Sequence, residues 1–234
     1  HQDSLDSGSR IRDGLSNAVE QSIILFANGF LYHPENEKLR QSIIDGDLSA
    51  KDFYRYQLKF IYRLLFLMVI EERDLIFTKS TPRKKKDIYY NYYSVSRIRK
   101  LSEKRYLADK KYSDVWMSLK NTFKLYENEL YGAQLEVKPL GGDLFGSNAI
   151  GLLTECELDN KVMLECLTNL SVFTNPATHQ KMRINYASLN VEEFGSVYEG
   201  LLEYDPVLEA NGGKVNFRFK AGSDRSSSGS HYTP

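Results

Sequence analysis

The clearest helical pattern in the chain lies at residues 49–72, which read SAKDFYRYQLKFIYRLLFLMVIEE. Ser49 and Asp52 form a capping box, in which the serine and the acid satisfy the first free amides of a helix. Apolar side chains then cover much of the circumference of that helix, and such a helix lies in the middle of a bundle. Because Lys59 and Arg63 interrupt the apolar run, its unbroken part at 64–70 is far too short to span a bilayer.

Weaker helical patterns continue on both sides of this segment. Apolar residues recur at helical spacing from Leu15 to Phe30, and the expected end of that helix is marked by Asn28-Gly29 and His33-Pro34. Gly132 is a candidate helix C-cap and Asn190 a candidate N-cap. Further helices are expected at residues 35–44, 114–131, 160–173 and 190–204.

Strand signals are confined to the second half of the chain. Asn211-Gly212-Gly213 separates two apolar runs and predicts a hairpin, whereas the alternation at 182–186 is that of a short strand or an extended linker. We therefore expect a mainly α fold, an irregular multi-helix bundle with a small β-hairpin near the C-terminus. Its expected parts are a frayed or disordered leader at 1–12, a helical connector domain at 13–205, the β-hairpin at 206–222 and a linker at 223–234.

The composition of the 234 residues is that of an ordinary globular protein, with 41% hydrophobic and 26% charged residues. This argues against a disordered, collagen-like or disulfide-stapled chain. Cys156 and Cys166 are the two cysteines, and no CxxC or HxxxH motif accompanies them, so we expect buried thiols and no metal site. Nothing in the sequence suggests secretion or a membrane span, so we expect a cytoplasmic protein.

The balanced charge of the whole chain, 31 basic against 31 acidic residues, hides a strongly basic segment. Residues 79–111 contain twelve basic and three acidic residues and carry a net charge of +9, which leaves −9 on the remainder. Clustered cations interleaved with tyrosines are typical of phosphate contact. The alternative is a solvated basic loop beside tyrosines of the core. The candidate contacts to double-stranded DNA are Arg83, Lys84, Lys85, Lys86, Arg97, Arg99, Lys100, Lys104 and Arg105.

Several catalytic motifs are missing from the sequence. There is no phosphate-binding Gly-x-x-x-x-Gly-Lys-Ser/Thr loop, and no polar-Pro-Pro-aromatic tetrad for methylation of a flipped base. The acid-x-Lys strings at 109–111 and 136–138 match a magnesium nuclease only as common short strings do. We therefore expect no catalytic residues and no metal ligands in this chain.

Particular strings give the sequence a family resemblance. It resembles the region just upstream of the methyltransferase domain in large adenine-specific DNA methyltransferases, including type IIG restriction–modification enzymes and the BREX and DISARM phage-defence methyltransferases. The longest matching string is VEEFGSVYEGLL at 191–202. The others are ANGFL at 27–31 with His33-Pro34, YRLLFL at 62–67 with EERDL at 71–75, GGDLF at 141–145, and GSHYTP at 229–234.

The resemblance implies a role and a cofactor. The parent enzyme would transfer a methyl group from S-adenosylmethionine to adenine N6 in double-stranded DNA, with or without cleavage of the DNA. Tyr232, Thr233 and Pro234 would lie beside the methyl-donor pocket of the parent, although the glycine-rich cofactor loop and the tetrad are absent here. This chain alone would be an inactive connector that binds no cofactor, its 223–234 linker leading into an absent methyltransferase domain.

Two expectations concern partners. As a connector, the chain would position the catalytic and recognition domains of its parent and contact the DNA backbone. The alternative is a protein–protein docking module of a phage-defence complex with no DNA contact, which would need an exposed apolar patch. Gly195 and Gly200 lie five residues apart on one expected helix, where small residues would let another backbone approach closely.

Overall fold

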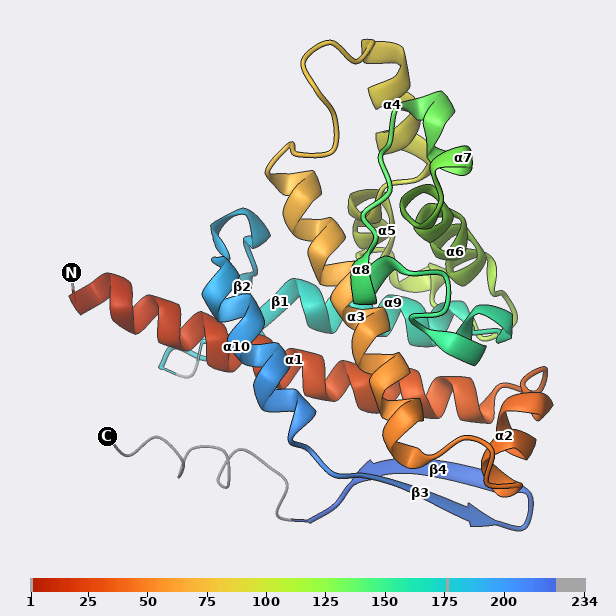
Figure 1. The fold of residues 1–234 in the computed structure, drawn as a ribbon. Helices are drawn as coiled ribbons and strands as arrows, with labels where there is room; N and C mark the ends of the chain where they lie inside the picture. Colours follow the sequence, from red (N-terminus) through yellow and green to blue (C-terminus); the bar gives the residue numbers. More distant parts are fainter. Residues whose placement is uncertain (1, 176, 222–234) are drawn as a thin grey trace.

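The computed structural model describes residues 2–175 and 177–221, and its fold is mainly helical at 62% (Figure 1). The predicted fold class is confirmed. The α-helices are α1 (Gln2–Tyr32), α2 (Glu37–Ile44), α3 (Ala50–Glu72), α4 (Arg83–Tyr92), α5 (Val95–Leu101), α6 (Asp114–Glu127), α7 (Glu129–Gly132), α8 (Gly142–Phe145), α9 (Asn160–Ser171) and α10 (Val191–Leu202). The 3-10 turns are η1 (Arg105–Leu107), η2 (Ala133–Leu135), η3 (Gly151–Glu155) and η4 (Tyr186–Ser188). The strands are β1 (Val172–Thr174), β2 (Lys181–Arg183), β3 (Pro206–Asn211) and β4 (Lys214–Phe219).

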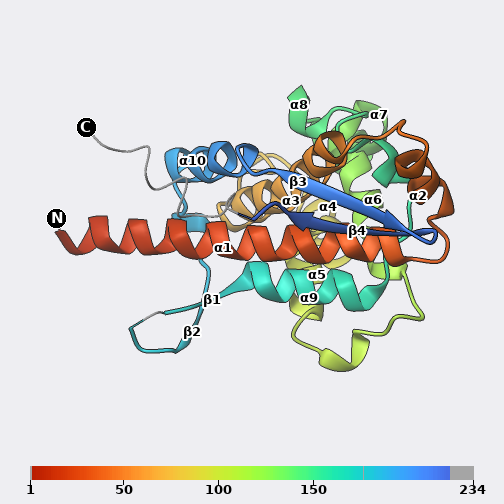
Figure 2. The same cartoon turned by 90° about the horizontal axis from the view of Figure 1, so that it is seen from below.

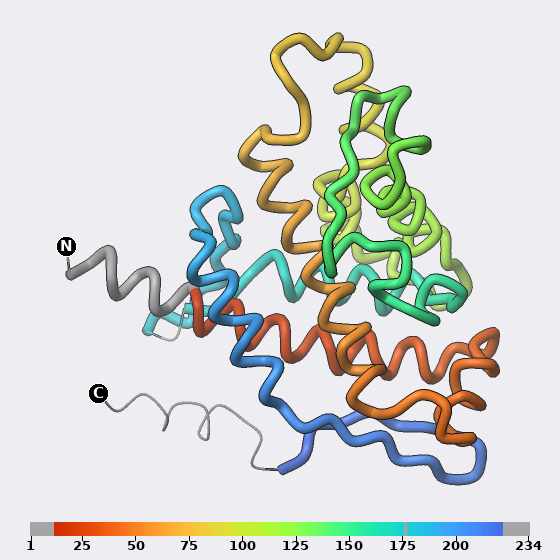
Figure 3. The backbone as a smooth tube through the Cα atoms, viewed as in Figure 1, coloured from red at the N-terminus to blue at the C-terminus, as the bar shows by residue number. Residues whose placement is uncertain are grey.

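Helix α3 is the centre of the bundle, as its apolar circumference predicts. Its cap forms as expected, because the Ser49 side chain accepts a hydrogen bond from the Asp52 amide at 3.1 Å. The helix crosses α1 and continues upward in contact with α5 and α8 (Figure 3), and its Tyr62 packs on two rings of α10. Around Phe60 the rings pack edge to face, with centroid distances of 4.6 Å to Phe26, 5.1 Å to Trp116 and 6.0 Å to Phe123. Aromatic rings from α1, α3 and α6 therefore form the core.

Helix α1 does not end at Asn28-Gly29, which both lie inside it. Gly29 is needed for packing, because a Cβ there would approach Val162 of α9 to 2.7 Å. The Asn28 side chain bonds the backbone of the C-terminal hairpin, accepting from the Phe217 amide at 2.9 Å and donating to its carbonyl at 3.2 Å. Both residues therefore dock other elements onto α1.

The predicted β-hairpin is confirmed. Strands β3 and β4 pair antiparallel across Gly212 and Gly213, whose positive φ angles of 60° and 81° suit a tight hairpin turn. The hairpin runs along α1 (Figures 1 and 2) and buries Phe217 against Phe53 and Tyr54 of α3. It thus covers the lower end of the central helix.

Three local expectations need correction. Helix α9 ends at Ser171, because Val172–Thr174 leave it to pair antiparallel with β2. Of the two alternatives for residues 182–186, a short strand or an extended linker, the strand forms at Met182 and Arg183, which belong to β2. Gly132 is no left-handed cap, since its φ is −86°. A Cβ at Gly132 would lie 2.3 Å from the Val137 carbonyl oxygen, so close packing requires the glycine. The helix expected at 114–131 is interrupted at Asn128, which separates α6 from α7.

We predict that Phe60→Ala lowers the free energy of unfolding by about 3–5 kcal/mol, because it leaves a cavity among four aromatic rings. Met117→Ala is the control, since that side chain on α6 is 55% exposed, and its effect should stay within about 0.5 kcal/mol. Urea unfolding followed by circular dichroism measures both. Equal losses for the two variants would contradict a core centred on Phe60.

Candidate functional site

A shallow groove of about 300 Å³ opens where α3, α8 and α10 meet. Its lining is mostly apolar and aromatic, with one cation and one carboxylate at the edges. The contact between α3 and α10 could not be predicted from the sequence, because the two helices are more than a hundred residues apart along the chain. The lining residues are Lys59, Tyr62, Asp143, Leu144, Phe194, Gly195 and Tyr198.

Tyr62 forms the floor of the groove. Its ring packs edge to face on Phe194 and on Tyr198, each at a centroid distance of 4.8 Å. Its hydroxyl donates to the Phe194 carbonyl at 3.3 Å, which anchors the first turn of α10 to α3. Desolvation raises the pKa of Tyr62 far above that of a free phenol, so this hydroxyl stays protonated as a donor.

Arg63 holds the second wall of the groove in place. Its guanidinium is fully buried and donates from Nε to the Leu144 carbonyl at 2.6 Å and from Nη2 to the Gly146 carbonyl at 2.9 Å. Glu127 accepts from Nη1 at 2.6 Å and neutralises the charge. Burial lowers the pKa of Arg63 and Glu127 opposes that shift. The loop at 141–146 is thereby tied to the central helix.

The acidic C-terminal end of α3 contacts α5 on the other side of the bundle. The buried Glu71 carboxylate accepts from the Val95 and Ser96 amides at 2.9 and 2.8 Å, so it caps the first turn of α5. It also accepts from the Ser96 hydroxyl at 2.7 Å and the Tyr89 hydroxyl at 2.7 Å. Burial raises the pKa of Glu71, and these four hydrogen bonds oppose the shift.

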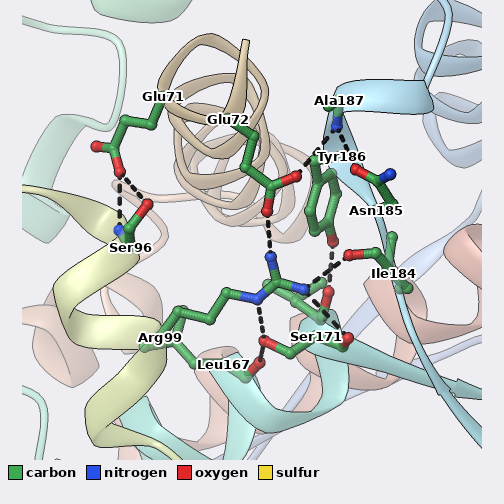
Figure 4. A network of polar contacts seen from close by, with 11 residues as sticks. Glu71, Glu72, Ser96, Arg99, Leu167, Ser171, Ile184, Asn185, Tyr186 and Ala187 are labelled. Carbon is green, nitrogen blue, oxygen red and sulfur yellow. Dashed lines mark hydrogen bonds and ion pairs between the residues drawn. The ribbon is translucent and has the colours of Figure 1, made fainter. Parts of the chain in front are cut away.

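Arg99 of α5 is the centre of a second polar network (Figure 4). Its side chain is only 4% exposed and pairs with Glu72 at 2.6 Å. It donates to the Ser171 hydroxyl at 2.9 Å and to the Ile184 carbonyl at 2.8 Å, at the base of the β1–β2 ribbon. Burial lowers the pKa of Arg99 and Glu72 opposes the shift. The structure therefore places Arg99 inside, where it stabilises the fold and is out of reach of a DNA phosphate.

Apart from Arg97, the remaining predicted DNA contacts fall into two separate patches. The α4 patch comprises Arg83, Lys84, Lys85 and Lys86, and α4 lies at the top of Figure 1 beside α5 and η2. The Lys85 ammonium is 3.5 Å from Glu136, and the Arg83 guanidinium is 3.9 Å from Asp87. Part of the positive charge of this patch is therefore balanced within the chain.

The η1 patch lies on another side of the molecule. It comprises three exposed cations, Lys100 in the last turn of α5 and Lys104 and Arg105 in the loop that follows, which extends past α9 in Figure 2. Arg97 belongs to neither patch, because it is half-buried on α5 and its Nη2 donates to the Ser118 hydroxyl. The candidate DNA contacts that are close in the sequence therefore do not form one continuous surface in the structure.

The tyrosines interleaved with the cations of this segment, Tyr89, Tyr90, Tyr92 and Tyr93, differ in burial: Tyr90 and Tyr93 are half-buried, and Tyr92 is 68% exposed. Tyr89 is fully buried and bonded to Glu71, whereas Tyr106 and Tyr112 are 78% and 60% exposed. The rings of Tyr106 and Tyr112 lie in the η1 loop, and each follows directly after a pair of cations, at 104–105 and 110–111 respectively. The position of each ring directly after two cations could have pointed to these tyrosines. The sequence does not show which tyrosine rings are buried in the core. Tyr232, Thr233 and Pro234 lie outside the described residues.

Comparison with known proteins adds no relative: no family model, curated protein or solved structure matches the chain. Within residues 2–175 and 177–221, no group of three or more His, Cys, Asp or Glu side chains could hold a metal ion. In the same part of the chain, no helix is both long and apolar enough to cross a bilayer. Cys156 and Cys166 are free and buried, as predicted.

We predict opposite outcomes for two adjacent cations. Arg99→Ala should lower the free energy of unfolding by about 3–5 kcal/mol, because it leaves Glu72 and two carbonyls without their partner. Lys100→Ala removes the same charge from an exposed position and should change stability by less than about 0.5 kcal/mol. Thermal or urea unfolding compares them. A stable Arg99→Ala variant would contradict the structural role of the network.

Proposed function

We propose that the chain is a non-catalytic helical connector of an adenine-N6 DNA methyltransferase that acts in restriction–modification or phage defence. The observation that supports this is where the family-like strings meet. Tyr62 from the string at 62–67, Leu144 from 141–145 and Phe194 from 191–202 line one groove. Strings that a family shares are expected to contact one another when they specify a common packing unit.

The string at 71–75 supports the same interpretation. Glu71 caps α5 and Glu72 pairs with Arg99, while Arg73 donates to the Ala187 carbonyl at 3.0 Å, just before α10. Charged residues of this one string therefore join α3 to α5 and to the segment that leads into α10. This is what a connector requires, because rigid joints fix the relative placement of attached domains.

In the parent, S-adenosylmethionine would supply the methyl group, and Tyr232, Thr233 and Pro234 would help to wall its pocket. The described residues would position the attached domains and contact the DNA. The η1 patch is the better candidate for the DNA backbone, because its three cations are exposed and the exposed Tyr106 and Tyr112 follow them in the same segment. A cytoplasmic location is part of this proposal, since the substrate is cellular DNA.

Duplex-DNA binding by the chain at two salt concentrations tests the proposal. Replacing Lys100, Lys104 and Arg105 by Ala should weaken binding and reduce the slope of log Kd against log salt by about one per lost phosphate contact. A second triple variant, with Ala at Arg83, Lys84 and Lys86, measures the α4 patch separately.

The matched control carries Ala at Lys38, Lys51 and Lys214, which are exposed cations on other elements. Their replacement lowers the net charge by the same amount as in the other two variants. It should bind DNA as the unmodified chain does. An equal effect of all three variants would show only a dependence on net charge. Absence of binding at low salt would overturn the DNA-contacting role and leave the docking module, which the exposed apolar groove independently favours.

A further inference from the structure

One face of α10 is apolar and exposed, because no other element of the described chain covers it. Val191 is 79% exposed and Leu202 is 42% exposed. With Gly195 and Tyr198 they follow one another at intervals of four, three and four residues, so they form a single stripe along the helix. The buried face of α10, which includes Val197 and Leu201, points instead toward the core. This stripe is therefore additional to the packing face.

The stripe continues into the groove at Tyr62, because Gly195 and Tyr198 belong to both. The expectation that Gly195 and Gly200 receive another backbone is not met inside the described residues, since a Cβ at either position would meet no atom within 4 Å. Of the two, Gly195 lies in the stripe. It leaves a notch in which the backbone of a second helix could approach closely.

The outer flank of the stripe is acidic. Glu192, Glu199 and Glu203 are exposed at intervals of seven and four residues, so they form a row parallel to the stripe. Asp143 adds a carboxylate at the opposite wall. Lys59 and Arg55 are the cations on the α3 side of the groove, and the exposed Arg55 lies close enough to Tyr198 to influence it electrostatically.

We propose that this face, defined by Val191, Gly195, Tyr198, Leu202 and the groove at Tyr62, docks a basic amphipathic helix of a protein partner. Its apolar side would cover the stripe, and its Lys or Arg side chains would face the acidic row. Charge complementarity selects this occupant, because an acidic or uncharged helix would leave the row of three carboxylates unpaired. The inference goes beyond DNA contact and uses a different surface, so each can fail without the other.

Two synthetic helical peptides of about 18 residues test the proposal, one with Leu at the stripe spacing and flanking Lys, the other with Glu in place of Lys. Fluorescence anisotropy with the full chain should show binding of the basic peptide at least about tenfold tighter than the acidic one, with the difference shrinking at high salt. Equal affinities, or no binding of the basic peptide at millimolar concentration, would overturn the proposal.

Two variants locate the site. Gly195→Leu fills the notch on an exposed helix position without a clash, and should weaken peptide binding at least about tenfold. Gln at Glu192, Glu199 and Glu203 should weaken it about three- to tenfold and remove most of the salt dependence. The control places Gln at Glu35, Glu37 and Glu155, which are exposed elsewhere, and should bind normally. Equal weakening by the control would overturn the assignment.

Two further measurements keep the outcomes distinct. Circular dichroism and urea unfolding show that each variant is folded and as stable as the unmodified chain, so lost peptide binding can then be assigned to the groove. Sedimentation across a range of protein concentrations tests a second copy as occupant. Self-association that Gly195→Leu abolishes would identify a second copy on this face and overturn the proposal of a basic helix.

Discussion

The structure depends on neutralising the charges that the central helix carries into the protein. Arg63 and Glu71 of α3 are buried, and an uncompensated buried charge costs several kcal/mol. Arg63 is satisfied by Glu127 and by two carbonyls of the loop at 141–146, and Glu71 by the first amides of α5. Each compensation binds an element that is distant in sequence. The same contacts that remove the electrostatic cost therefore assemble the bundle around α3.

This arrangement explains why the groove and the η1 patch lie around α3. At its middle, Tyr62 and the loop held by Arg63 form two walls of the groove, and α10 forms the third. At its end, Glu72 and Arg73 hold α5 and the segment before α10. The η1 patch follows directly from α5, so its position also depends on the ion pair between Glu72 and Arg99.

Residues that look alike in sequence have different roles in the fold. Arg99 and Lys100 are adjacent cations in one basic run, yet Arg99 is enclosed by Glu72 and backbone carbonyls while Lys100 is exposed. Tyr89 and Tyr106 differ in the same way. Local sequence shows that a residue is cationic or aromatic. It does not show which side of a short helix such as α5 will face another element, because that depends on what packs against it.

Local chemistry was sufficient for the fold class and for much of the secondary structure, but not for the ends of α1 and α9. The Ser49 and Asn190 caps, the apolar circumference of α3 and the Gly-Gly hairpin turn are interactions between near neighbours, so they could be predicted from the chain alone. The groove at Tyr62, the burial of Arg99 and the division of the basic segment could not. These features arise where segments distant in sequence meet, and the burial of a charge or the exposure of a helix face depends on those long-range contacts.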